Sequence, residues 1–199
     1  MKKSKGFAHN LQMTKTYILM LLFLMTAFMT CLPQEATAAW SKRVIDGGLV
    51  KDTSIKVDIN GYVHMSFVKG GCLIYFNNKS GKWVKTIIDS SGQVGVYISM
   101  AVDGSGKVHV SYYDETNTAL RYATNATGAW VKTTVDNSGD VGKCASIAVD
   151  SSGKVYVSYF DFINTALKYA TNATGTWVKK TVDNSADVGW DTSIAVDSG

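Results

Sequence analysis

Residues 146–192 read SIAVDSSGKVYVSYFDFINTALKYATNATGTWVKKTVDNSADVGWDT, and the chain around them is built from copies of this stretch. Residues 99–145 form a copy of the same 47-residue length, which differs from it at thirteen positions. A looser copy, two residues shorter, begins at Ser54, and a further copy begins at Ser193. A repeat near this length is the signature of a propeller or a solenoid.

Each copy divides into four short segments rich in Val, Ile, Tyr, Thr and Trp, as strands are. In the copy at 99–145 these segments are residues 99–103, 107–114, 119–124 and 130–136. Asp103-Gly-Ser-Gly joins the first segment to the second, and Asn125-Ala-Thr-Gly joins the third to the fourth. In such turns the Asp or Asn side chain caps the turn and glycine takes the positive φ. Four antiparallel strands in a repeated meander are a propeller blade.

The sequence therefore predicts an all-β fold, a β-propeller with four-stranded antiparallel blades at residues 54–89, 99–136 and 146–183. Residues 40–46, WSKRVID, match the fourth strand of the repeat, and residues 193–197 match the first strand of a next blade. Three blades with these flanking strands make an incomplete ring, since propellers have about four to eight blades. We expect 40–199 to be a fragment of a longer propeller; the alternative is a ring assembled from several chains. Open blade edges favour self-association.

Residues 1–39 have the pattern of a secretory signal peptide. A basic start is followed by an apolar stretch at residues 17–29 and by the small-residue site Ala36-Thr37-Ala38. We expect cleavage, followed by a secreted, periplasmic or cell-surface location without membrane insertion. The alternatives are a retained anchor and a lipid on Cys31, and Met13 is an alternative start.

Most of the net charge of +4 comes from the leader, because residues 40–199 hold 16 basic and 15 acidic side chains. Nucleic acid is therefore not an expected partner. Cys72 and Cys144 occupy different positions in the repeat, which excludes a repeated disulfide framework. We expect two partly buried thiols, and a single bridge between them stays open.

The strings SIAVDSSGKVYVSYFD, NTALKYATNATGTW and TVDNSADVG resemble the repeats of secreted bacterial β-propellers of the BNR/Asp-box-like and lectin-like groups. The strict Asp-box pattern Ser-x-Asp-x-Gly-x-x-Trp is not matched, so the resemblance concerns the scaffold. The resemblance also raises the possibility of a sialidase-like glycoside hydrolase. As the family implies, that chemistry needs an arginine cluster, a Tyr nucleophile with a Glu partner, and an acidic side chain as general acid. Residues 40–199 hold only two arginines, Arg43 and Arg121, and a single glutamate, Glu115, so we expect no enzyme.

Metal and cofactor sites have little support. Residues 136–140 and 183–187 alternate oxygen-bearing side chains of the kind Ca²⁺ accepts, but they lack the glycine and the distal Glu of a complete loop. His64 and His109 occupy the same repeat position, where the next copy has Tyr156, which indicates a packing position rather than a zinc ligand. We therefore predict no metal and no cofactor.

In a meander, the loop after the second strand and the loop between blades lie on one face, opposite the tight turns. Seven of the thirteen differences between the copies fall in or beside these loops, which makes this face the better candidate for binding. Aromatic rings beside carboxylates suit carbohydrate, and the residues predicted to bind it are Tyr113, Asp114, Phe160, Asp161 and Trp190. The repeated Trp83, Trp130 and Trp177 are expected to pack between blades. The sequence thus favours a binding module for glycan; the alternative is a structural propeller that binds another extracellular protein.

Overall fold

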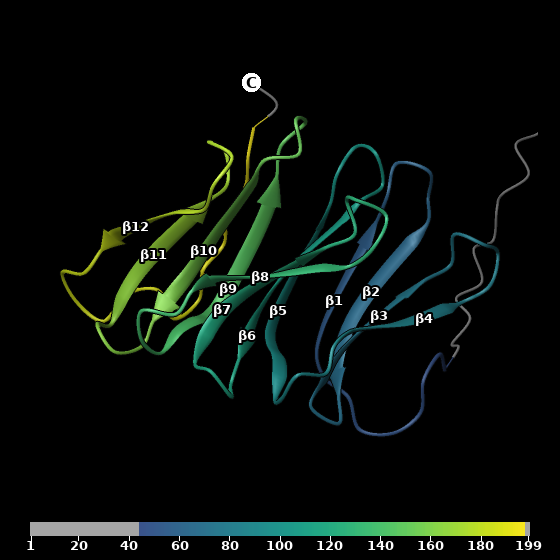
Figure 1. Ribbon diagram of the computed structural model, residues 1–199, viewed down its shortest axis with the longest axis horizontal. Helices are drawn as coiled ribbons and strands as arrows, with labels where there is room; N and C mark the ends of the chain where they lie inside the picture. Colours follow the sequence, from purple (N-terminus) through teal and green to yellow (C-terminus); the bar gives the residue numbers. More distant parts are fainter. Residues whose placement is uncertain (1–43, 198–199) are drawn as a thin grey trace, which may run out of the picture. The chain divides into compact units, whose positions relative to one another are not determined.

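The computed structural model describes residues 44–197, and these form an incomplete β-propeller of three antiparallel four-stranded sheets without a helix (Figure 1). The predicted signal peptide and residues 40–43 lie outside the described residues. The first sheet comprises β1 (Lys51–Val57), β2 (Val63–Lys69), β3 (Cys72–Asn77) and β4 (Val84–Asp89). The second comprises β5 (Val94–Val102), β6 (Val108–Asp114), β7 (Ala119–Thr124) and β8 (Val131–Asp136). The third comprises β9 (Val141–Val149), β10 (Val155–Asp161), β11 (Ala166–Thr171) and β12 (Val178–Asp183).

Each sheet is a simple meander, as predicted, and we call the three sheets blades 1, 2 and 3 in chain order. The first strand of each blade begins earlier than the alternation suggested: β5 starts at Val94 rather than at residue 99. A bulge explains the difference, because the pairing of β5 with β6 shifts register on both sides of Val96. Tyr97 within this bulge has φ +53°, and its repeat equivalents Asp52 and Cys144 also have positive φ.

The two flanking segments differ from the prediction. Over the described residues, neither 44–46 nor 193–197 forms a strand, because a strand requires a hydrogen-bonded neighbour along its length. Ile194 N–H does donate to Ser146 Oγ at 3.2 Å, as Ile147 N–H donates to Ser99 Oγ at the same distance. Ile194 therefore contacts β9 in the same way that Ile147 of β9 contacts β5.

The hydrophobic core lies between the blades. Leu73 and Tyr75 of blade 1 pack with Met100 and Tyr112 of blade 2, and all four are buried. An equivalent cluster joins blades 2 and 3. Trp130 meets the ring of Tyr75 edge-on at 5.2 Å between centroids, and Trp177 meets Tyr122 in the same way, so these tryptophans pack between blades as predicted.

Buried carboxylates also join the blades. Asp89 ends blade 1, and it accepts hydrogen bonds from Tyr112 Oη at 2.7 Å and Lys132 Nζ at 2.8 Å, both in blade 2. Burial alone would raise the pKa of Asp89, but the hydrogen bonds, that from Lys132 foremost, outweigh it and lower the pKa to about 2. Asp136 makes the equivalent contacts with blade 3. Asp46 takes the same repeat position and binds Lys69 and Lys85 of blade 1.

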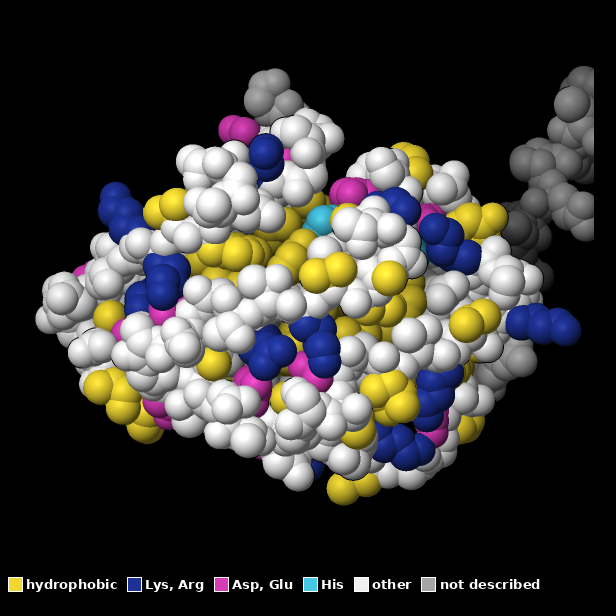
Figure 2. Space-filling view, in the orientation of Figure 1, with side chains coloured by type: hydrophobic (Ala, Val, Ile, Leu, Met, Phe, Trp, Pro, Cys, Tyr) yellow, Lys and Arg dark blue, Asp and Glu magenta, His cyan; other side chains and the backbone are white. Residues whose placement is uncertain are grey.

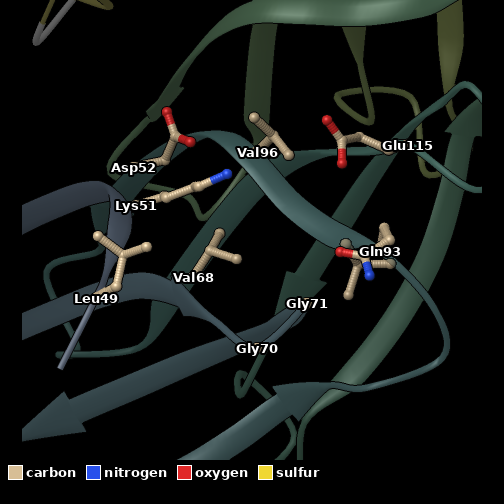
Figure 3. A pocket seen from close by; sticks show the side chains of 10 residues that line it. Leu49, Lys51, Asp52, Val68, Gly70, Gly71, Gln93, Val96 and Glu115 are labelled. Carbon is tan, nitrogen blue, oxygen red and sulfur yellow. The ribbon is translucent and has the colours of Figure 1, made fainter.

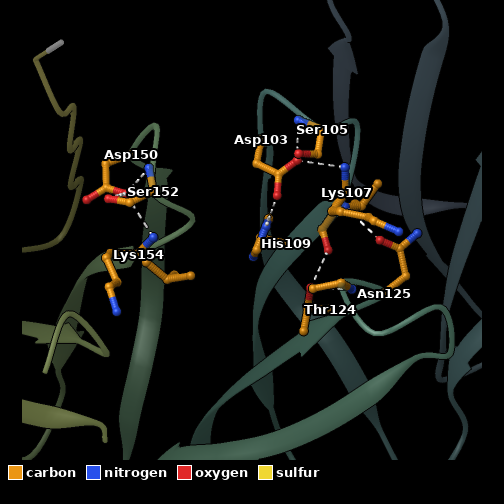
Figure 4. A network of polar contacts seen from close by, with 12 residues as sticks. Asp103, Ser105, Lys107, His109, Thr124, Asn125, Asp150, Ser152 and Lys154 are labelled. Atoms are coloured by element: carbon orange, nitrogen blue, oxygen red, sulfur yellow. Dashed lines mark hydrogen bonds and ion pairs between the residues drawn. The ribbon is translucent and has the colours of Figure 1, made fainter. Parts of the chain in front are cut away.

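The Asp residues of the tight turns cap those turns, as predicted (Figure 4). Asp103 Oδ1 accepts from Ser105 N–H and Lys107 N–H, while its other oxygen lies 3.4 Å from His109 Nε2. His109 Nδ1 lies 2.7 Å from Tyr122 Oη, and His64 makes the equivalent pair of contacts in blade 1. Both histidines are buried, which agrees with a packing position.

Candidate functional site

The loop after the second strand of each blade and the loop between blades share one face of the blades, as the sequence indicated. Glu115, in the loop after β6, donates its N–H to Gln93 O at 2.9 Å, and Phe162 donates to Asp140 O at the same distance. Val141 N–H also bonds Thr118 O of the blade before it, at 3.2 Å. These bonds tie each inter-blade loop to the loops beside it, and we call this side of the molecule the loop face.

The repeat builds the same inter-blade site three times on the loop face. Each site combines the penultimate residue of a blade's second strand, the last residue of the following inter-blade loop, and the third residue beyond that. These residues are Val68, Gln93 and Val96 in the first site, Tyr113, Asp140 and Lys143 in the second, and Phe160, Asp187 and Trp190 in the third. The first and second sites also include a residue from the next blade's loop, Glu115 or Phe162. The three sites thus share one geometry and differ in chemistry.

Lys143 fills the second inter-blade site. Its ammonium lies 2.6 Å from Asp140 Oδ2, 3.9 Å from the centroid of the Phe162 ring and 5.4 Å from that of Tyr113. Tyr113 Oη donates to Asp140 Oδ1 at 2.6 Å. Burial, together with this hydrogen bond, raises the pKa of Tyr113, so the hydroxyl stays protonated. The site holds the ammonium of Lys143 between a carboxylate and two aromatic rings.

Trp190 forms an exposed aromatic platform at the third inter-blade site. Its ring centroid lies 4.6 Å from that of Phe160 and 6.0 Å from that of Phe162. The indole Nε1–H donates to Asp187 Oδ1 at 2.8 Å, which sets the orientation of the ring. Trp190 is 46% exposed and Phe162 is 44% exposed, whereas Phe160 is fully buried beneath them. We call Trp190 and Phe162, with Asp187 at their edge, the Trp190 platform.

The first inter-blade site is an open cavity of about 300 Å³ (Figure 3). Val68 and Val96 stand where the second site has Tyr113 and Lys143, so less side-chain volume fills it. The loop after β2 is two residues shorter, and Gly70 and Gly71 make the turn with φ +60° and +78°. A Cβ at Gly71 would lie 2.9 Å from Gln93 Oε1, so glycine also leaves space for the Gln93 amide.

The structure brings three of the five predicted residues, Tyr113, Phe160 and Trp190, into these inter-blade sites. Asp114 and Asp161 lie beneath the same loops, buried at 0% and 3% exposure. Asp114 accepts from Asn117 N–H and Nδ2, and Asp161 accepts equivalently from Asn164. Both carboxylates order the loops from within, so neither faces solvent, and Trp190 is the exposed member of the predicted set.

A second cavity, of about 270 Å³, lies where the first strands run side by side, and sequence reasoning missed it. It is lined by the positive-φ residues Asp52, Tyr97 and Cys144 and by their repeat equivalent Asp191. These four residues occupy the same position in successive copies of the repeat, and this shared position was the signal that the sequence offered for the cavity. Cys144 and Cys72 are free and partly buried, as expected.

Over residues 44–197 the side chains do not gather into a metal site of three or more His, Cys, Asp or Glu. No helix in the same range is long and apolar enough to cross a membrane. Figure 2 shows Lys and Arg scattered over one face, several beside an acidic side chain, rather than gathered in a basic patch.

No protein-family model matches the chain, and no curated protein matches it. Among solved structures, it is similar to a fucose lectin from Kordia zhangzhouensis, determined in complex with methyl-fucoside. The two share 17% identity with a TM-score of 0.43, over 65% of this chain and 97% of that chain. At this identity and score the likeness identifies no binding residue.

Proposed function

We propose that the protein is a secreted, non-enzymatic binding module that binds carbohydrate on its loop face, chiefly at the Trp190 platform. The observation that carries this proposal is that Trp190 and Phe162 lie side by side with a carboxylate at the edge of the indole, and that both rings are exposed within the residues that the structure describes. Large aromatic side chains are usually buried, and an exposed pair held in a fixed orientation is typical of a binding surface.

The chemistry of the Trp190 platform suits a neutral sugar. The C–H face of a pyranose ring stacks on an aromatic face, while hydroxyl groups bond to charged side chains at the edge of that face. Asp187 already accepts from the indole, and its second oxygen is available as an acceptor for a hydroxyl. The scattered charges of the surface do not favour a polyanion.

A protein partner is the second candidate, and one residue favours it. Ile163 follows Phe162 in the same loop and is 67% exposed, which enlarges the apolar surface beside the platform. Contiguous exposed apolar side chains mark protein interfaces as well as sugar sites. A sugar would leave Ile163 free of contact, whereas a protein partner would cover it.

A glycan array with the full chain, followed by calorimetry on the retained sugar, tests the proposal. We expect binding of a neutral glycan that Trp190→Ala weakens at least about tenfold, or about 1.4 kcal/mol, because the substitution removes the aromatic face on which the sugar stacks. The matched control is Tyr62→Ala, which removes an exposed aromatic residue near a tight turn of blade 1. A silent array, together with a protein ligand whose binding requires Ile163, would overturn the glycan proposal in favour of the protein partner.

A further inference from the structure

The first inter-blade site is formed by the same repeat positions as the second, but smaller side chains leave a cavity at its centre. At the second site the chain supplies the central group itself, the Lys143 ammonium, and Asp140 and two aromatic rings hold it. At the first site Val96 replaces Lys143 and Val68 replaces Tyr113, and a cavity of about 300 Å³ results. The same repeat positions therefore enclose a cavity at the first site, where the second site holds the ammonium of Lys143.

The polar groups of the cavity are suited to an amine. Glu115 stands where the second site has Phe162, and Gln93 stands where it has Asp140. The Glu115 N–H donates to Gln93 O at 2.9 Å, so the backbone holds these two residues together. The Glu115 carboxylate makes no ion pair with any described residue, so its oxygens are available as acceptors for a ligand.

The remaining lining suits the body of a small polar ligand. Figure 3 shows Lys51 and Asp52 across the cavity from Gln93 and Glu115, with Val68 and Val96 between them. Lys51 and Asp52 can bond hydroxyl groups as donor and acceptor, and the two valines offer an apolar surface. With two carboxylates to one ammonium in the lining, the cavity favours a cation. Its volume lies at the low end for small-molecule pockets, which suits one sugar ring rather than a chain.

We propose that this cavity binds a monosaccharide that carries a protonated primary amine, an amino sugar, with the ammonium between Glu115 and Gln93. The ring lies over Val68 and Val96, and its hydroxyls face Lys51 and Asp52. This inference extends the proposed carbohydrate binding to a second site of different selectivity, and it does not require the Trp190 platform.

The test titrates the full chain with glucosamine, glucose and N-acetylglucosamine near neutral pH and follows the amide resonances by NMR. Glucosamine should shift the resonances of Gln93, Val96 and Glu115 and bind about tenfold or more tightly than the two sugars that lack a charged amine. Glu115→Gln, which removes only the charge, should reduce this preference about tenfold. Trp190→Ala should leave glucosamine binding unchanged, which separates this site from the platform.

Two repeat-swap variants fill the cavity with residues that the next blade already accommodates. Val96→Lys copies Lys143 and Val68→Tyr copies Tyr113, and each should abolish glucosamine binding while retaining the circular dichroism of the parent. Equal affinity for glucose and glucosamine, unchanged binding in Glu115→Gln, or shifts confined to Trp190 would each overturn the inference. Absence of glucosamine binding would overturn it too, and binding of a neutral glycan at Trp190 would then still support the proposed function.

Discussion

Tyr159 of blade 3 donates a 2.8 Å hydrogen bond to the Asp136 carboxylate at the end of blade 2, and both side chains are fully buried. Lys168 and Lys179 of blade 3 also bond Asp136, at 2.8 and 3.0 Å. This contact repeats between blades 1 and 2, so neighbouring blades are joined by a carboxylate at the same depth in each interface. We call each such carboxylate, together with its tyrosine and lysine partners, a clamp. Each clamp lies at the start of an inter-blade loop, so the clamps hold the loop face together.

Asp136→Ala should destabilise the chain by about 3 kcal/mol, because it leaves a buried Tyr159 hydroxyl and two lysines without their acceptor. Urea unfolding measures the change. Asp183→Ala is the matched control: Asp183 has the same repeat position and caps the same kind of turn, but it bonds no lysine or tyrosine among the described residues. The control should destabilise the chain by no more than about 1 kcal/mol, the contribution of the turn hydrogen bond that it removes. Equal effects of the two substitutions would refute the clamp.

Acid should weaken the clamp at Asp89. Hydrogen bonds in the folded state hold the pKa of Asp89 at about 2 against the opposing effect of burial, below its usual value. A carboxyl with a lowered folded pKa contributes stability above its unfolded pKa, and that contribution is lost as the pH falls from about 4 towards 2. Asp89→Asn should lower stability at neutral pH and reduce the loss of stability over this range. A parallel pH profile for both proteins would contradict the assignment.

His109 should add a separate loss of stability in weaker acid. Burial lowers the pKa of His109, and the hydrogen bond to Asp103 offsets this only in part. The unfolded chain therefore takes up the proton at a higher pH than the folded chain, so stability declines as the pH falls below about 6.5. His109→Tyr copies Tyr156, which bonds Asp150 in blade 3 at 2.9 Å, and it should remove this component from the thermal unfolding profile.

A hydroxyl placed opposite Ser111 should stabilise the chain. Ser111 Oγ is buried without a hydrogen-bond partner, whereas its repeat equivalent Ser158 Oγ lies 3.0 Å from Thr192 Oγ1. Ala145 occupies the position of Thr192 in the preceding copy. Ala145→Thr should therefore raise the free energy of unfolding by about 1 kcal/mol. Ala145→Val, which has the same shape without the hydroxyl, should not reproduce the gain.

The blades could be predicted from the sequence because their signals are local. Asp103 and Gly106 define one turn, and the alternation from Val108 to Tyr112 defines the strand after it. The bulge at Tyr97 could not be predicted, since it depends on how β5 and β6 pair over a distance. This bulge places Val96, and the equivalent irregularity in β9 places Lys143, in the inter-blade sites, so the sequence did not show which residues make up those sites.

The sequence placed the candidate residues on the loop face, but it did not reveal the structural roles of two of their carboxylates. Asp114 follows two aromatic residues, a pattern that resembles a sugar site. The structure turns the carboxylate inward to bond Asn117, three residues later, and Asn164 repeats this relationship with Asp161. That spacing is a loop-capping signal, and it was present in the sequence. Packing of Trp190 on Phe160 joins residues thirty positions apart, which no local pattern indicates.

The indole N–H resonances of the tryptophans report on carbohydrate binding at the loop face, with Trp190→Phe used to assign the signal of Trp190. During titration with a neutral glycan retained on the array, the Trp190 signal should move and saturate, because a bound ring covers its exposed face beside Asp187. The signals of Trp130 and Trp177, which pack between blades, should stay in place. Saturable glycan binding that leaves the Trp190 signal unchanged would contradict the proposed site.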